Sequence, residues 1–354
     1  MKKRLLLGVA VLVLAVCALT GCGSKKEKLS IFLPGEYIDE SIVPEFEKKY
    51  NCGVDLELFE SNEMMYTKFM SGGNYDILIP SDYMIERLIK EDQLQKLDIS
   101  KITNYKDIMD ELKTAPFNGY DSSNSYSVPY FWGSTGIVYN KNNVSEEDVK
   151  KEGYAIFKNP KYKGKIYMYD SERDSFMMAF KDLGYSMNTE NEDEIMAAYN
   201  WLVEINTKMD PTTVTDDVID GMAQGRKDIA FMYSGDAAYV LSENEDMAFY
   251  APEYGTNVFV DAMVIPKNAK NVELAHKFID FVSTYDVALK NTESVGYTSA
   301  VKDVYADEIK EGGSFEGNDA YVPRTGYAKD EVFVDKEHLR KRLSELWIKV
   351  KAAK

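Results

Sequence analysis

Cysteine and histidine are scarce in this sequence, and their scarcity argues against several kinds of chemistry. The 354 residues include three cysteines and two histidines. Zinc centres and thiol-based catalysis need such residues in clusters or at defined spacings. His276 and His338 have no such partners, and we expect both to lie on the surfaces of helices. Phosphate-cradling and calcium-binding loop motifs are also missing. We therefore expect no metal site, no cofactor and no enzymatic activity.

Basic residues are outnumbered by acidic ones. The chain holds 42 lysines and arginines against 59 aspartates and glutamates, a formal net charge of -17. The first 21 residues contain three basic residues and no acid, so the remainder carries 39 basic and 59 acidic residues, or -20. Such a chain has little attraction for nucleic acid or anionic lipid surfaces. Most of these acids must lie on a solvated surface, but the balance favours a cationic ligand over an anionic one.

The N-terminal residues have the pattern of an export signal. Three basic residues precede an apolar run from Leu5 to Leu19, which is short for a membrane-spanning helix but suits a signal peptide. The run ends in Leu19-Thr20-Gly21-Cys22, which resembles the lipobox of bacterial lipoproteins. We predict that residues 1–21 are a lipoprotein signal peptide and that Cys22 is lipidated. An ordinary secretory signal followed by a chance cysteine is the alternative.

Lipidation of Cys22 would fix the location of the mature protein. It would be secreted and held at the outer face of the cytoplasmic membrane, on the periplasmic side, with residues 22–28 as a polar tether. Cys17 would leave with the signal peptide, so Cys52 would be the one unmodified thiol and no intramolecular disulfide is expected. We expect Cys52 to be buried as a small apolar residue.

The pattern of apolar residues predicts two α/β regions, as a chain of this length suggests. Residues 29–79 alternate between strand-like and helix-like segments, with Asn62 as the expected cap of a helix. A second alternating series begins near residue 165 and includes a strand at 229–233 and a long apolar strand at 258–265. Such alternation predicts parallel sheets covered by helices.

Residues at the predicted carboxyl ends of the strands indicate what a cleft between two such regions would bind, because ligands of open α/β sheets lie beyond these ends. The set contains no lysine or arginine. Its acidic, hydroxyl and aromatic members are Glu36-Tyr37, Glu60-Ser61, Ser81-Asp82-Tyr83, Asp170-Ser171 and Ser234-Gly235-Asp236. An alkyl diammonium suits this set. Its nitrogens only donate hydrogen bonds and need carboxylates, and aromatic faces suit its methylene groups and its charge.

At these positions the chain resembles the spermidine/putrescine-binding proteins of bacterial ABC importers. The resemblance extends from about Leu29 to the C-terminus. Each matching segment alone is weak, but their order and spacing together are specific. The segments are Glu60-Ser61-Asn62-Glu63, Tyr75-Asp76 through Pro80-Ser81, Pro129-Tyr130 with Trp132-Gly133, Leu183-Gly184-Tyr185-Ser186, Ala197-Ala198-Tyr199-Asn200, Ile265-Pro266 with Asn268-Ala269-Lys270-Asn271, and Gly296-Tyr297.

This resemblance implies a fold and a set of partners. The fold is a two-lobed α/β fold of the periplasmic-binding-protein type II, with a ligand cleft between lobes joined by crossing strands. The implied lobes are residues 29–137 plus 261–300, and residues 138–260 plus 301–354. The protein would be a monomer that binds a polyamine and delivers it to ABC permease subunits, with no nucleic-acid partner.

The resemblance also implies the ligand-binding residues. The tryptophan that follows the family's first strand is Pro34 here, and Tyr233 and Phe259 stand where the family has tryptophans. A family glutamine near the C-terminus is replaced by a residue near Phe333. These departures leave the length of the polyamine open. The implied set is Glu36, Tyr37, Ser81, Asp82, Tyr83, Asp170, Ser171, Asp174, Tyr233, Phe259, Asp261 and Tyr297.

Asp261 stands out even without the resemblance. An acid inside the apolar run 258–265 is costly unless it has a partner, and no lysine or arginine is an obvious mate in the sequence. A ligand ammonium is the predicted counter-charge. Other functions stay open: a receptor for another small organic cation, a ferric-ion receptor that uses tyrosines, or a polyamine sensor that feeds no transporter. A secreted hydrolase is less well supported, because no catalytic pair can be placed.

Overall fold

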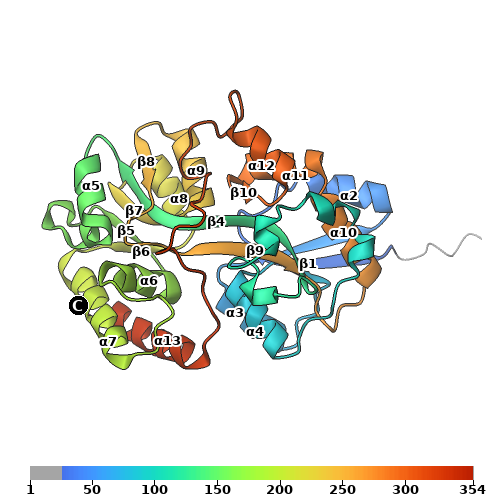
Figure 1. Cartoon of the computed structure of the whole chain (residues 1–354), viewed down its shortest axis with the longest axis horizontal. Coiled ribbons are helices and arrows are strands. Elements are labelled where there is room, and N and C mark those ends of the chain that lie inside the picture. The colour runs from blue at the N-terminus through green and yellow to red at the C-terminus, as the bar shows by residue number, and fades with distance from the viewer. Residues whose placement is uncertain (1–25, 354) are drawn as a thin grey trace, which may run out of the picture.

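Two strands carry the chain between the two halves of the molecule (Figure 1). They are β4 (Ser127–Asn140) and β9 (Val258–Val264), which pair antiparallel in the middle of a ten-stranded sheet. The computed structural model describes residues 26–353. The predicted signal peptide and Cys22 therefore lie outside the described residues. The predicted α/β fold of two lobes joined by crossing strands is confirmed.

The first half contains one end of the sheet and the helices that cover it, and parallel pairing joins β1 to both β2 and β3, as predicted. Its elements in chain order are β1 (Lys28–Pro34), α2 (Ile42–Tyr50), β2 (Gly53–Phe59), α3 (Asn62–Met70), β3 (Ile77–Leu78), α4 (Asp82–Lys90) and four short 3-10 helices, η1 (Ile99–Lys101), η2 (Thr103–Asp107), η3 (Glu111–Lys113) and η4 (Gly119–Asp121).

The second half contains the other end of the sheet, where β5 pairs in parallel with β6 and β7. Its elements are α5 (Glu146–Glu152), η5 (Gly153–Lys158), η6 (Pro160–Tyr162), β5 (Ile166–Tyr169), α6 (Glu172–Asp182), α7 (Glu192–Lys208), β6 (Thr212–Val214), α8 (Asp217–Ala223), β7 (Ile229–Tyr233), α9 (Ser234–Glu243) and β8 (Met247–Tyr250). The full order along the sheet is β2-β1-β3-β9-β4-β7-β5-β6, with β8 and β10 paired to β4.

The C-terminal part of the chain contributes to both halves. Its elements are α10 (Val272–Val282), α11 (Tyr285–Val295), β10 (Thr298–Ser299), α12 (Lys302–Ile309) and α13 (Glu337–Ala352). Helix α12 packs against α11 and β10, whereas α13 packs against α6 and α7. The lobe division at residues 300 and 301 remains a prediction, and these contacts favour placing 301–309 with the first lobe. No helix among residues 26–353 has the length and apolar character needed to span a membrane.

The crossing strands form the core of the molecule. All residues of β4 and β9 are buried, which explains why neither strand alternates between apolar and polar residues. Trp132 of β4 is 1% exposed, and its indole nitrogen donates a hydrogen bond to the carbonyl of Ser299. Cys52 is buried, as predicted.

Two local predictions were wrong. The cap of helix α3 is Ser61, whose hydroxyl accepts from the Met64 N–H, and not Asn62. The Asn62 side chain instead bonds to Ser81, with its amide group as donor to the hydroxyl and its oxygen as acceptor from the backbone. His276 was expected at the surface but is buried, and both ring nitrogens have partners there: Nε2 accepts from the Asp98 N–H and Nδ1 lies 2.8 Å from the carbonyl of Val272.

Candidate ligand-binding site

A cavity of about 350 Å³ lies where the two halves meet. All twelve residues that the resemblance implied line this cavity. They come from both halves, because the carboxyl ends of β1, β3, β5 and β7 and the middle of β9 face the same space. The predicted convergence of these strand ends is therefore met.

Asp261 lies in the middle of the crossing strand β9, opposite Phe131 of β4. The Tyr37 hydroxyl donates a hydrogen bond to its Oδ2. No residue among 26–353 offers a hydrogen bond to its Oδ1, which is buried. Burial raises the pKa of Asp261 from 3.8 to about 6, while the nearby hydroxyl groups of Ser81 and Tyr37 act in the opposite direction. The site thus contains a buried carboxylate with one oxygen left for an external donor.

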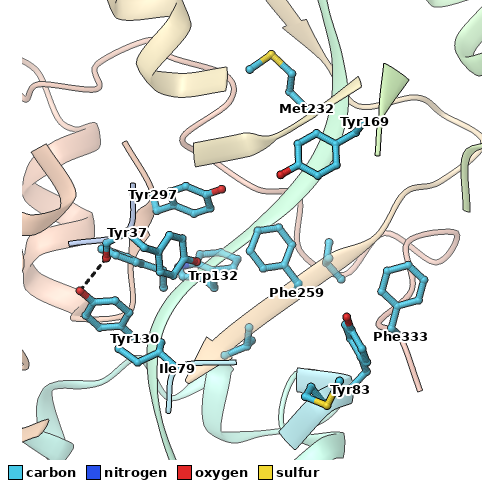
Figure 2. Close-up of a cluster of buried hydrophobic side chains, with 14 of the residues drawn as sticks. Tyr37, Ile79, Tyr83, Tyr130, Trp132, Tyr169, Met232, Phe259, Tyr297 and Phe333 are labelled. Atoms are coloured by element: carbon cyan, nitrogen blue, oxygen red, sulfur yellow. Dashed lines mark hydrogen bonds between the residues drawn. The ribbon is translucent and has the colours of Figure 1, made fainter. Parts of the chain in front are cut away.

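Aromatic rings form a cluster in this part of the molecule (Figure 2). Tyr37 contacts Tyr297 edge-to-face at 4.6 Å between ring centres, and Tyr297 lies 6.5 Å from Phe259. Phe259 is 5.7 Å from Tyr233, which is 5.2 Å from Tyr169. Tyr130 fixes the loop that carries Tyr37 by donating to its carbonyl oxygen, the dashed contact in Figure 2. These rings offer faces that attract a cation and apolar walls for an alkyl chain.

Asp174, in the first turn of α6, is a second buried acid. Its Oδ2 accepts hydrogen bonds of 2.6 Å from the hydroxyls of Ser171 and Tyr233. Burial is the largest effect on its pKa, which is raised above its usual value. The cap residue Ser171 and the ring of Tyr233 therefore orient this carboxylate toward the cavity from the second half.

The loop that follows β3 contributes Ser81, Asp82 and Tyr83. Both oxygens of Asp82 accept from backbone N–H groups, those of Tyr83 at 2.6 Å and Val260 at 3.3 Å. The pKa of Asp82 is raised to about 8, mainly by burial and in part by the nearby Asp261. Asp82 thus ties α4 to β9 and is better suited to fixing the cavity wall than to pairing with a cation.

Two of the predicted acids are less enclosed. Glu36 is exposed at the cavity rim, in a left-handed backbone conformation with φ of 51°. Asp170 already has partners in the protein: the Trp347 indole and the Lys351 ammonium each donate to its Oδ1 at 2.9 Å. Of the predicted acids, Asp261 and Asp174 are therefore the best placed for a buried cation.

Several residues that line the cavity were not predicted as ligand contacts. Asp236, at the start of α9, is buried, and burial raises its pKa to about 7, with Asp216 and Glu36 adding to the shift. Asp216 accepts a hydrogen bond of 3.3 Å from Tyr169. Asp236 was visible as a strand-end acid in the sequence, whereas Asp216 follows β6, a strand of three mostly exposed residues that has no apolar pattern.

The strand-end residues singled out in the sequence include no basic residue, but the cavity has two in its lining. Arg173 and Lys351 both line the cavity. Neither follows a strand directly: Arg173 is in the first turn of α6 and Lys351 is near the end of α13. Strand ends alone therefore gave an incomplete account of the charge in the site.

A ferric ion was one of the ligands that the sequence left open. Within residues 26–353, no group of three or more histidine, cysteine, aspartate or glutamate side chains is placed to hold a metal ion. Buried carboxylates and tyrosine rings are groups that suit an organic cation.

The chain is similar to known proteins in sequence and in fold. A family model described as "Bacterial extracellular solute-binding protein" matches residues 41–316. The spermidine/putrescine-binding periplasmic protein of Escherichia coli is 34% identical over 264 residues, which are 74% of each chain. The putrescine/cadaverine-binding protein of Pseudomonas aeruginosa is 28% identical over 373 residues and covers 99% of each chain.

A solved structure agrees with these matches. It is that of PotD, a spermidine/putrescine ABC transporter substrate-binding protein from Streptococcus pneumoniae. It is 33% identical and has a TM-score of 0.75, with 92% of this chain and 99% of that chain covered. The resemblance inferred from the sequence segments is confirmed.

Proposed function

This chain belongs to the family of bacterial extracellular solute-binding proteins, and on that premise we propose that it captures a polyamine and delivers it to the permease of an ABC importer. The names of its relatives support this proposal, since they include spermidine/putrescine-binding and putrescine/cadaverine-binding proteins. Such a protein binds and releases its solute unchanged, so we propose no enzymatic activity.

The observation that carries the proposal is that Oδ1 of Asp261 is buried and meets no hydrogen-bond donor among residues 26–353. A buried carboxylate oxygen without a donor destabilises the empty site, and a bound ammonium supplies both the missing hydrogen bond and the opposite charge. The rings of Tyr37, Phe259 and Tyr297 border the same space and would enclose the methylene groups next to that nitrogen.

We assign roles to the remaining residues on the same physical grounds. Asp174 and Asp236 are the buried acids available to a second ammonium group, and Tyr169 and Tyr233 would contact the chain between the nitrogens. The other proposed ligand contacts lie at the rim or in the wall of the cavity; they are Glu36, Ser81, Asp82, Tyr83, Asp170 and Ser171.

The two halves would move during binding. The proposed lobes are residues 29–137 plus 261–300 and residues 138–260 plus 301–354, and the contacts of α12 support moving 301–309 to the first lobe. β4 and β9 join the halves, so a hinge in these strands would open the cavity to solvent.

We further propose that the protein acts on the outer side of the cytoplasmic membrane as a monomer, anchored through lipid on Cys22. The periplasmic relatives support an extracytoplasmic location. The anchor depends on the sequence Leu19-Thr20-Gly21-Cys22, which lies outside the described residues.

The deciding experiment is a binding screen of the purified protein by calorimetry and thermal shift. Putrescine, cadaverine and spermidine should raise the melting temperature, because a ligand that binds only the folded state stabilises it by about 2.7 kcal/mol at a hundredfold excess over Kd. Neutral sugars, sulfate, amino acids and ferric citrate serve as controls. A shift with any control ligand and none with a polyamine would overturn the proposal and favour one of the alternative receptors.

A further inference from the structure

The cavity wall contains a buried cation of the protein itself, Arg173. Arg173 is 5% exposed, although an arginine in the first turn of a helix usually extends into water. Its guanidinium carbon lies 3.8 Å from the centre of the Tyr83 ring and 5.6 Å from that of Phe333. Its Nε lies 3.4 Å from Oε1 of Glu63. A side chain from the second half of the molecule is therefore enclosed by groups from α3 and α4 of the first half.

These partners hold one another in place. The Tyr83 hydroxyl lies 3.2 Å from a carboxylate oxygen of Glu63, and the Tyr83 ring contacts Phe333 edge-to-face at 5.9 Å. Figure 2 shows Tyr83 and Phe333 facing each other at one end of the cluster, away from Tyr37 and Tyr297. Arg173 thus completes a contact among three segments that are distant in the sequence.

The segment that carries Phe333 is itself attached to the first half. The Asp335 N–H donates to Oε2 of Glu86 at 2.6 Å, and the Lys90 ammonium donates to the Asp335 carbonyl at 3.0 Å. Both partners belong to α4, which also carries Tyr83. This end of the cavity is therefore closed by α3, α4, α6 and the segment before α13.

The arrangement around Arg173 contains opposing effects. Stacking on Tyr83 and the pair with Glu63 favour the closed contact. Against them, Nη2 of Arg173 is buried and meets no acceptor within the described part of the chain. A buried donor without an acceptor regains water when the contact opens. Because the favourable and unfavourable effects oppose each other, this contact is suited to forming and breaking as the lobes move, and less suited to staying closed permanently.

We propose that Arg173 is a latch between the two lobes, which forms with Tyr83 and Glu63 when the cavity closes and thereby slows release of the bound ligand. Its role in this proposal is to position the lobes, through its contacts with Tyr83 and Glu63 of the first half. The choice of polyamine as the test ligand rests on the proposed function, whereas the effect on lobe closure does not.

The test compares Arg173→Met, Arg173→Lys and Glu63→Gln with a control, Arg226→Met. Arg226 is exposed, donates a hydrogen bond to Gln224 and does not line the cavity. Stopped-flow kinetics with putrescine and with spermidine measure the rate constants of association and release. The release rate constant of Arg173→Met should exceed that of the parent by about tenfold or more, and the association rate constant should change less. Glu63→Gln and Arg173→Lys should show smaller increases, and the control none. Small-angle scattering of the ligand-free protein should give a larger radius of gyration for Arg173→Met.

The release rates and the radius of gyration together decide whether Arg173 holds the two lobes closed. Parental release rates in Arg173→Met, with a parental radius of gyration, would overturn the latch and leave polyamine capture standing. If Arg173→Met does not fold, parental release rates in both Glu63→Gln and Arg173→Lys would overturn it. If the parent protein binds no polyamine, the proposed function fails, and the radius of gyration alone decides whether Arg173 closes the lobes.

Discussion

The Tyr37 hydroxyl donates a hydrogen bond to Oδ2 of Asp261 and so connects the loop after β1 to the crossing strand β9. This contact leaves Oδ1 as the carboxylate oxygen without a donor among the described residues. Burial and the adjacent Asp261 raise the pKa of Tyr37 well above its usual value, so the phenol remains a donor at neutral pH. The hydrogen bond therefore orients the carboxylate and decides which of its oxygens lacks a donor within residues 26–353.

Replacement of Asp261 by asparagine should weaken polyamine binding by about ten- to a hundredfold, because it removes a charge-assisted hydrogen bond while keeping the shape of the side chain. Isothermal calorimetry measures the change. Asp246→Asn is a matched control, since Asp246 is exposed and outside the cavity wall. Equal affinity of Asp261→Asn and the parent would show that Asp261 does not bind the ammonium, and Asp174 with Asp236 would become the leading pair.

Binding and stability should respond to pH in opposite directions. The pKa of Asp261 is raised from 3.8 to about 6 and that of Asp236 from 3.8 to about 7. Polyamine affinity should decrease as the pH is lowered from about 7 to 5, because these carboxyl groups take up protons and lose their attraction for ammonium groups.

The ligand-free protein should instead become less stable as pH rises from about 4 to 7. In that range the folded state holds protons on Asp261 and Asp236 that the unfolded chain has already released, so the free energy of unfolding decreases with rising pH. Asp261→Asn should reduce this slope. Melting curves at several pH values, with and without spermidine, measure both effects. A stabilisation by spermidine that is independent of pH would contradict the assignment of these two acids.

The sequence predicted much of this site because its key residues carry local signals. Asp261 is an acid inside an apolar strand, and Asp236 follows a strand that is apolar throughout. β4 was not predicted, because serine, proline, glycine and threonine interrupt its apolar residues, and its burial depends on strands that come later in the chain.

Arg173 shows the limit of such predictions. Nothing in the segment Glu172–Asp182 distinguishes it from a solvated arginine at a helix start, and its burial depends on Tyr83 and Phe333, which are far away in the sequence. Tertiary contacts of this kind have no periodic pattern in either segment. The same reason explains why the buried His276 was expected at the surface.

Gly235 is predicted to be essential for the position of an aromatic wall. A methyl group added at this residue would overlap the ring of Tyr297. Alanine normally favours a helix over glycine, so destabilisation of Gly235→Ala would reflect this overlap and not helix propensity. We expect a cost of about 1–3 kcal/mol in unfolding free energy and weaker polyamine binding. Gly119→Ala is the control, since no described atom lies within 4 Å of its added methyl group. Parental affinity in Gly235→Ala would mean that Tyr297 does not contact the ligand.

Cys22→Ala should release the protein from the membrane or leave the signal peptide uncleaved. The prediction depends on Leu19-Thr20-Gly21-Cys22 after a short apolar run. Cys17→Ala changes the other cysteine of the same segment and should be processed and retained like the parent. Metabolic labelling with a radioactive fatty acid and membrane fractionation measure the effect. Labelling of the Cys22→Ala protein at the parental level would rule out this anchor.

Asp261 and Asp236 should hold opposite ends of a diamine. Both acids are buried and line the same cavity, Asp261 from the crossing strand and Asp236 from the start of α9. If each pairs with one nitrogen, putrescine should lose about tenfold or more in affinity in Asp261→Asn and in Asp236→Asn. Butylamine has a similar chain and only one nitrogen, so it should lose affinity in one variant and little in the other. Asp217→Asn removes an exposed charge near the same end of the molecule and should affect neither ligand. Equal losses for butylamine in both variants would instead place the two carboxylates around a single ammonium group, which would favour a monoamine or another small cation over a diamine.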